Sequence, residues 1–367
     1  MRVLRRILIA TVLTALAAAL THPISAQDIE SQDQVTMFGV PPETARAVLE
    51  IEGSTDTIAF APILKAFANS VPDLAIRYHE ITTNELYDLA AGECRGERPA
   101  TDLVVSSSID QQVKLANDGC AQPNHSGQVK ALPAWAKWRD EVVGLTYEPA
   151  VIVYNRDLIA PSDVPQSRFD LIDLLRPASN PYNGRIATYD IERSGVGYLF
   201  AFVDAQQATT YGRLIEAFGR NKVVATCCSA EIIDAVASGR FLIAYNMLGS
   251  YALARAAGDR RIGVVAPIDY TLILARAALI PKRAPNPDLA RQFIDYALSD
   301  AGRRFLAASG LIVSFGDAGS VGSTTLSGTT PALRPIAFSP SLLVGLDRQT
   351  RENFLKLWRS SLGGARP

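Results

Sequence analysis

The stretch VLEIEGSTDTIAFAPILKAFA, residues 48–68, contains the pattern that decides the fold. Val48 to Ile51 are typical of a buried strand, and Gly53 to Asp56 are typical of a turn. From Thr57 to Ala68 the apolar residues recur at helical spacing, which predicts an amphipathic helix. The stretch is therefore a strand–loop–helix unit, from which α/β folds are built.

The same unit recurs along the chain in two blocks. In the first block, strands are predicted at 74–78 and 103–105, each followed by a helix that starts near 83 or 109. The second block has predicted strands at 185–188, 223–225 and 241–244, with helices at 196–205 and 230–237. Two long apolar segments, 142–154 and 263–281, are interrupted by Pro149 and Pro267, which cannot donate to a sheet ladder. We therefore expect two α/β lobes linked by crossing strands.

The remaining segments are assigned from composition and periodicity. Residues 27–47 are polar and predicted to be loosely ordered, and 314–333 are rich in Gly, Ser and Thr, as in a surface loop. Helices are predicted over 287–308 and 340–362.

Polar residues follow the predicted strands at four loops, 53–56, 106–110, 190–195 and 245–251. In open α/β sheets, ligands bind outside the carboxyl ends of the strands, so these loops predict a site in the cleft between the lobes. Each group also has a structural interpretation: helix caps, a charged surface loop, or core tyrosines. The candidate ligand-binding residues are Ser54, Thr55, Asp56, Ser107, Ser108, Glu192, Ser194, Gly195, Tyr245, Asn246, Ser250 and Tyr251.

The N-terminus has the pattern of a secretory signal peptide, residues 1–26. Arg2, Arg5 and Arg6 precede an uncharged apolar run from Ile7 to Leu20, and a small residue, Ala26, ends the segment. The formal net charge is −1, so loss of those arginines leaves the mature chain moderately acidic. This balance gives no reason to expect nucleic acid as a partner. We expect the mature chain to be soluble and exported.

Four cysteines would enter an oxidising compartment, where disulfides form. Cys94 and Cys120 each follow a predicted helix, and the two helices are neighbours in sequence, which favours a bridge between them. The adjacent Cys227 and Cys228 are either a vicinal disulfide or two free thiols, and the disulfide is slightly favoured.

Catalytic and cofactor sites are not indicated. The chain has three histidines, of which His22 leaves with the signal peptide, and it lacks a nucleophile elbow, a zinc motif, a P-loop or a dinucleotide fingerprint. We therefore expect no enzyme activity, no cofactor and no metal centre. Ferric iron, which prefers oxygen donors, is kept as an alternative through His79 and Glu80 with a phenolate, whereas the six-position spacing of Tyr245 and Tyr251 weakens that alternative.

The chain resembles the periplasmic solute-binding proteins of ABC importers. The resemblance rests on Ser54-Thr55-Asp56, on the segment from Pro149 to Asn155, on Tyr245 to Tyr251, and on Ala284 to Pro287. It is similar to the type II group that contains ferric-iron-binding and sugar-phosphate- or phosphoglycerate-binding proteins. Iron-binding members present two adjacent tyrosines, and this sequence has no Tyr-Tyr pair.

The resemblance implies a two-lobed α/β fold that closes around one solute. Lobe one would contain 44–147 and 272–325, and lobe two 148–271 and 326–367. A monomer would bind a small anionic or polyhydroxylated solute, such as a sugar phosphate, and present it to an ABC permease in the inner membrane. The alternative partner is a membrane histidine kinase, for which the protein would act as a ligand sensor.

Overall fold

The computed structural model describes residues 34–207, 209–315, 324–326 and 331–362. The predicted signal peptide, 1–26, lies outside these residues, as does most of the loop predicted at 314–333. Within the described ranges, no helix combines the length and the hydropathy that crossing a bilayer requires.

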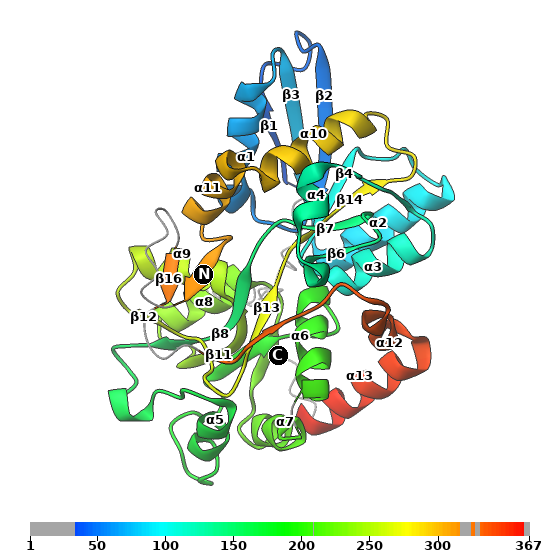
Figure 1. The fold of residues 1–367 in the computed structure, drawn as a ribbon. Coiled ribbons are helices and arrows are strands. Elements are labelled where there is room, and N and C mark those ends of the chain that lie inside the picture. The colour runs from blue at the N-terminus through cyan, green and yellow to red at the C-terminus, as the bar shows by residue number, and fades with distance from the viewer. Residues whose placement is uncertain (1–33, 208, 316–323, 327–330, 363–367) are drawn as a thin grey trace, which may run out of the picture. The chain divides into compact units, whose positions relative to one another are not determined.

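The first sheet has eight strands and is built mainly from the first half of the chain (Figure 1). Its order is β1-β3-β2-β4-β14-β7-β6, with β5 beside β14. β2 runs parallel to both β3 and β4, so the carboxyl ends of these three strands share one edge. The strands are β1 Gln34–Gly39, β2 Ala47–Gly53, β3 Leu74–Glu80, β4 Leu103–Ser106, β5 Ala121–Gln122, β6 Lys137–Trp138, β7 Val142–Gly144 and β14 Ala277–Pro281.

The second sheet has seven strands, in the order β10-β9-β11-β8-β13-β17 with β12 beside β8. β9 is parallel to β10 and β11, whereas β8 is antiparallel to β11 and β13. The strands are β8 Glu148–Asn155, β9 Ile186–Tyr189, β10 Val224–Thr226, β11 Ile243–Leu248, β12 Ile262–Val265, β13 Thr271–Leu274 and β17 Leu333–Pro335. A separate pair is formed by β15 Val313–Phe315 and β16 Thr324–Leu326.

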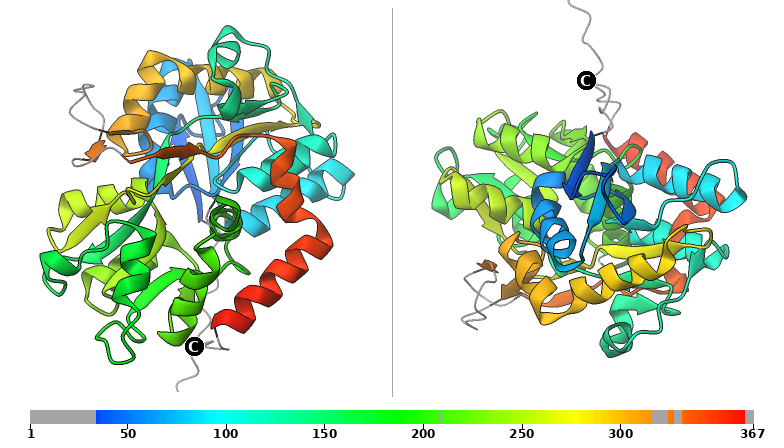
Figure 2. Two further views of the ribbon diagram at one scale, coloured as in Figure 1. Left: turned by 60° about the horizontal axis from the view of Figure 1, so that its bottom comes forward. Right: turned by 90° about the horizontal axis from the view of Figure 1, so that it is seen from above.

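Helices cover both sheets, as Figure 2 shows. Those of the first sheet are α1 Thr57–Ser70, α2 Thr83–Arg95, α3 Ile109–Asn117, α4 Gly127–Ala131, α10 Pro287–Leu298 and α11 Asp300–Ala308. Those that follow β8 are α5 Arg168–Leu174, α6 Gly195–Gln207, α7 Tyr211–Arg220, α8 Ser229–Ala237 and α9 Gly249–Gly258. The C-terminal helices are α12 Leu343–Leu346 and α13 Arg348–Leu362, and the short 3-10 helices are η1 Ala134–Ala136, η2 Pro161–Asp163 and η3 Pro340–Leu342.

Several element boundaries differ from the sequence prediction. The predicted helix at 287–308 is broken at Ser299, whose Oγ accepts a hydrogen bond from Gly302 N and starts a new helix. The predicted helix at 340–362 is likewise broken at Asp347. Residues 34–39, predicted to be loosely ordered, form an edge strand because they pair with β3 along its length.

Two short segments carry the chain directly from a strand of one sheet to a strand of the other. Leu145 to Tyr147 connect β7 to β8, and Ala275 and Arg276 connect β13 to β14. The first apolar segment, for which the sequence allows either two strands or one strand with a crossing point, forms two strands, and Pro149 lies inside β8 rather than at the break. Each crossing brings a charged residue, Glu148 or Arg276, to the boundary of the two sheets.

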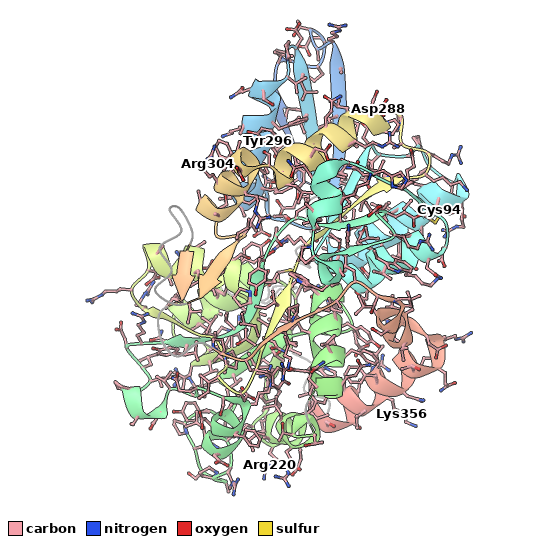
Figure 3. The ribbon with its side chains drawn as sticks, in the orientation of Figure 1. Cys94, Arg220, Asp288, Tyr296, Arg304 and Lys356 are labelled. Atoms are coloured by element: carbon pink, nitrogen blue, oxygen red, sulfur yellow. A yellow bond between two sulfur atoms is a disulfide. The ribbon has the colours of Figure 1, made fainter. Side chains whose placement is uncertain are left out.

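The predicted Cys94–Cys120 disulfide is confirmed. It ties the last turn of α2, labelled at Cys94 in Figure 3, to the residue before β5. Cys227 and Cys228 are bonded as a vicinal pair directly before α8.

Candidate functional site

Helix α1 starts at the carboxyl edge of the first sheet, and the backbone N–H of its first residue is already bound within the protein. Asp56 stands at the N-cap position but its side chain does not cap the helix. Instead, the Glu80 carboxylate at the end of β3 accepts hydrogen bonds from Thr57 N and Thr57 Oγ1, both at 2.7 Å. The position where an external anion would meet this helix start therefore holds a carboxylate of the protein.

Tyr251 joins the second sheet's helix α9 to this loop. Its hydroxyl donates to Asp56 Oδ1 at 2.9 Å and accepts from Asp56 N at 3.1 Å. Burial raises the pKa of both the Asp56 carboxyl and the Tyr251 hydroxyl above their ordinary values. The two residues predicted separately from 53–56 and 245–251 are thus in direct contact.

A buried ion pair between Arg276 and Glu148 lies at the two crossings. Arg276 Nε is 2.8 Å from Glu148 Oε1, and both side chains are at most 1% exposed. Arg276 Nη1 donates to Thr55 Oγ1 at 3.0 Å, and Ser250 Oγ donates to Glu148 Oε2. The pair therefore links the loop before α1 with the start of α9.

Neither member of the ion pair was predicted to belong to the site. A signal was present, because Glu148 is the one charged residue in the apolar segment 142–154. Arg276 is likewise a charge inside a predicted buried strand segment. A charged residue in such a segment needs a buried partner, and each crossing supplies the partner of the other.

The serine loop after β4 packs beside the loop before α1. Ser107 N donates to Ser54 Oγ at 3.1 Å, and the two hydroxyl oxygens are 3.4 Å apart. Ser108 Oγ donates to Asp110 Oδ1 at 2.8 Å in the first turn of α3. Burial raises the pKa of the Asp110 carboxyl to about 6. The structure thus brings Ser107 to the predicted site, while the Ser108 hydroxyl is directed to Asp110.

Helix α6 begins against the starts of α2 and α3. Gly195 N donates to Thr83 Oγ1 at 2.8 Å, and Asn84 Nδ2 donates to Arg193 O at 2.9 Å. A Cβ atom at Gly195 would lie 2.7 Å from Ser108 Oγ, so only glycine permits this approach. Thr83 and Asn84 were missed because nothing in the sequence relates α2 to α6.

The other candidates of this loop have structural partners. Ser194 Oγ accepts from Gly197 N at 3.1 Å and so caps α6. Glu192 forms an ion pair with Arg359 of α13, with Oε2 2.6 Å from Nη2.

Tyr245 and Asn246 point away from the group around Tyr251. β11 continues to Leu248, where the sequence predicted a loop from 245, and its register with β8 shifts between Ala244 and Met247. Asn246 occupies the shift with φ of 62°. Tyr245 Oη and Asn246 Nδ2 donate to the buried Asp204 Oδ2 at 2.5 and 3.0 Å. Asp204 also binds Arg168, so these side chains stabilise the core of the second sheet.

Tyr189, at the end of β9, is a further residue that the sequence did not single out. Its hydroxyl is 2.5 Å from Ser229 Oγ at the start of α8 and accepts from Leu248 N at 3.3 Å. Burial raises the pKa of Tyr189 to about 12. The hydroxyl thus joins the starts of α8 and α9, next to the Cys227–Cys228 pair.

We call the residues that meet at the crossings the crossing cluster: Ser54, Thr55, Asp56, Glu148, Ser250, Tyr251 and Arg276. It contains one cationic and two acidic side chains, and the cation is paired with Glu148. Its chemistry is that of hydroxyl and carboxylate groups, which recognise hydroxyl or ammonium groups. In the described part of the chain, no set of three or more His, Cys, Asp or Glu residues is placed to hold a metal ion.

Comparison with known proteins identifies a family model and solved structures that resemble this chain. A family model described as bacterial extracellular solute-binding protein matches residues 54–312. The structure of the substrate-binding protein of an ABC transporter from Agrobacterium tumefaciens matches with a TM-score of 0.80 and 35% identity. That match covers 90% of this chain and 98% of the other. A search of curated proteins found no match.

Two more distant structures show the same fold. The periplasmic binding protein AfuA from Actinobacillus pleuropneumoniae, solved with fructose-6-phosphate, has a TM-score of 0.68 at 17% identity, covering 88% of this chain and all of that one. The ferric binding protein from Campylobacter jejuni has a TM-score of 0.64 at 17% identity, covering 85% and 99%. The architecture is therefore the two-lobed type II periplasmic binding fold.

Proposed function

The chain belongs to the bacterial extracellular solute-binding proteins that serve ABC transporters, and from this membership we propose that it binds a small polyhydroxylated organic solute. The solute would be bound between the lobes and the loaded form presented to an ABC permease. One lobe would be built around the first sheet and the other around the second, with the chain crossing at 145–147 and 275–276. The crossing cluster is the observation that carries this proposal.

Hinge closure is supported by contacts between elements of the two sheets. Tyr251 of α9 binds Asp56 before α1, and Gly195 of α6 packs on Thr83 of α2. Rotation of one lobe against the other would make or break both contacts together. A solute with several hydroxyl groups can bind both sides at once and so stabilise the closed form.

The solute class is argued from the charges around the helix starts. Glu80 occupies the start of α1, and the buried Asp110 lies in the first turn of α3. The start of α6 is occupied by Thr83 and Ser194, and Arg276 is paired with Glu148. An added dianion would meet a carboxylate at the starts of α1 and α3, and Arg276 is already paired; the cation near the start of α6 is Arg193, whose charge is exposed to solvent and screened by it. We therefore rank sugars, polyols and amino sugars ahead of sugar phosphates.

Ferric iron fits this arrangement poorly. Tyr245 lies in the core of the second sheet, apart from Tyr251. Burial raises the pKa of the Tyr251 hydroxyl, which opposes the phenolate that iron binding needs. Loading the protein with Fe(III) should give no visible tyrosinate charge-transfer band.

Calorimetry with matched solutes tests the proposed class. Sugars, polyols and amino sugars are compared with their phosphate esters, for example D-fructose with D-fructose 6-phosphate. Mass spectrometry of compounds that co-purify from the native periplasm identifies the natural solute. Tighter binding of the esters, or no binding by any member of the panel, would show that the proposed class is wrong.

A further inference from the structure

A cavity lies where α2 and α3 face the C-terminal helices, and no residue of the crossing cluster lines it. Its volume is about 380 Å³, within the range of small-molecule sites. Figure 2 shows the red C-terminal helices running from beside the cyan helices of the first sheet towards the green helices of the second. The lining includes Tyr87 and Asp88 of α2, Gln111 and Lys114 of α3, Leu346 of α12 and Arg351 of α13.

Two cationic side chains from different helices line this cavity. Arg351 lies over the Tyr198 ring, with Cζ 5.3 Å from the ring centroid. In the described ranges, no carboxylate lies within ion-pair distance of its guanidinium. Lys114 pairs with Asp118, the residue that follows α3, and Asp88 is the acidic residue of the lining. An anion between Arg351 and Lys114 would gain two cationic partners.

Gln111 offers an unused hydrogen-bond acceptor at the same place. Its side chain is 8% exposed, and its Nε2 donates to Asn84 Oδ1 at 2.8 Å. This contact fixes the amide orientation and leaves Oε1 buried without a hydrogen-bond partner among the described residues. A buried acceptor without a partner is costly, so the atom is suited to a ligand that donates a hydroxyl or amine hydrogen.

We propose that this cavity is a second binding site, selective for a small organic anion that also carries a hydroxyl or amine donor. Arg351 and Lys114 bind the carboxylate or phosphate group, and Gln111 Oε1 accepts the donor. Because α13 also packs on α7 of the second sheet, the bound anion would tie α2 and α3 to helices of the other lobe. Occupancy would therefore favour the closed form.

Titration calorimetry with glycerol 3-phosphate tests the site, because this probe combines an anion with hydroxyl groups. Glycerol, which supplies only the hydroxyl groups, and inorganic phosphate, which supplies only the anion, serve as comparison probes. We expect glycerol 3-phosphate to bind at least about tenfold more tightly than either. No binding of glycerol 3-phosphate at millimolar concentration would overturn the proposal.

Two double variants show where glycerol 3-phosphate binds. Lys114→Gln with Arg351→Gln should weaken the binding of glycerol 3-phosphate at least about tenfold. The matched control, Arg348→Gln with Lys356→Gln, removes two exposed cations of α13 and should leave the affinity unchanged; Lys356 is labelled in Figure 3. Tyr251→Phe alters the crossing cluster and removes a contact of the closed form, so it should weaken glycerol 3-phosphate binding less than the Lys114/Arg351 variant does. Binding lost in Tyr251→Phe but kept in the Lys114/Arg351 variant would assign the anion to the crossing cluster and refute a second site.

Discussion

Tyr251 and Tyr245 show at the level of single residues how similar side chains come to have different roles. They are six positions apart in one polar stretch, and the sequence offered both as ligand contacts. The irregular register around Asn246 sends Tyr245 towards Asp204, while Tyr251, in the first turn of α9, reaches Asp56. Side-chain direction here depends on a backbone conformation that the pattern does not reveal.

Replacing Tyr251 by Phe should weaken solute binding without unfolding the protein. The change removes a hydroxyl that serves both Asp56 N and Asp56 Oδ1 across the two lobes. We expect the affinity for the co-purifying solute to fall about tenfold, measured by calorimetry. Tyr245→Phe is the matched control: it should lower the free energy of unfolding by about 1–3 kcal/mol, because Asp204 loses a buried donor, with little change in affinity. If Tyr245→Phe weakened binding and Tyr251→Phe lowered stability instead, the assignment of the two tyrosines would be wrong.

Glu93 should make stability depend on pH. Burial, with the neighbouring Glu52 carboxylate, raises the pKa of Glu93 from 4.5 to about 7, although Arg98 Nη1 lies 3.0 Å away. The folded protein thus binds this proton more tightly than the unfolded chain, so stability is lost as the pH rises from about 4.5 to about 7. Glu93→Gln should gain on the order of 2 kcal/mol relative to wild type across that window.

Urea unfolding at several pH values measures this difference. Glu43→Gln, at an exposed position, is the control and should follow the wild-type pH profile. A Glu93→Gln protein whose stability relative to wild type is the same at pH 4 and pH 8 would contradict the assignment.

At the level of elements, the local sequence pattern predicted most strands and helices. The features that it did not predict depend on contacts between residues distant in sequence. The strand at 48–51 and the helix from Thr57 are found as β2 and α1, since both are encoded by short-range periodicity. The approach of α6 to α2 and α3 could not be predicted, because Gly195 and Thr83 are distant in sequence. The ion pair of the crossing cluster was missed for the same reason.

The Cys94–Cys120 disulfide should stabilise the α2–α3 pair. It closes a loop with a sequence separation of 26. Loop-closure entropy predicts that Cys94→Ala with Cys120→Ala lowers the free energy of unfolding by about 3 kcal/mol, measured by urea denaturation. Solute affinity should change little, because neither residue contacts the crossing cluster. Unchanged stability would mean that the unfolded chain gains little conformational entropy when the disulfide is removed.

Gly195 should control how closely α6 approaches the first lobe. A Cβ atom there would lie 2.7 Å from Ser108 Oγ and 3.0 Å from Thr83 Oγ1, so Gly195→Ala should oppose closure. We expect about tenfold weaker solute binding, and a larger radius of gyration in small-angle X-ray scattering of the solute-loaded protein. Gly212→Ala on α7, where nothing lies within 4 Å of the added Cβ, is the control. Equal affinities of the two variants would show that this contact does not limit closure.

At the scale of the whole molecule, the two short crossings place a charged pair at the boundary of the two sheets. Glu148 and Arg276 enter the boundary from different crossings and are paired there with almost no exposure to solvent. Thr55 binds Arg276 and Ser250 binds Glu148, so the pair holds the starts of α1 and α9 in place. In the proposed hinge closure, the lobes would rotate around this charged pair.

Removing one charge of this ion pair should destabilise the protein more than removing both charges. Glu148→Gln leaves the buried Arg276 without a counter-charge, which should lower the free energy of unfolding by about 3–5 kcal/mol. Glu148→Gln with Arg276→Met removes both charges, and we expect it to be more stable than the single variant in urea denaturation. Because Met cannot bind Thr55, the double variant should fold but bind solute weakly. If single and double variants lose equal stability, the pair does not act as a charged unit, and the crossings are held by apolar packing instead.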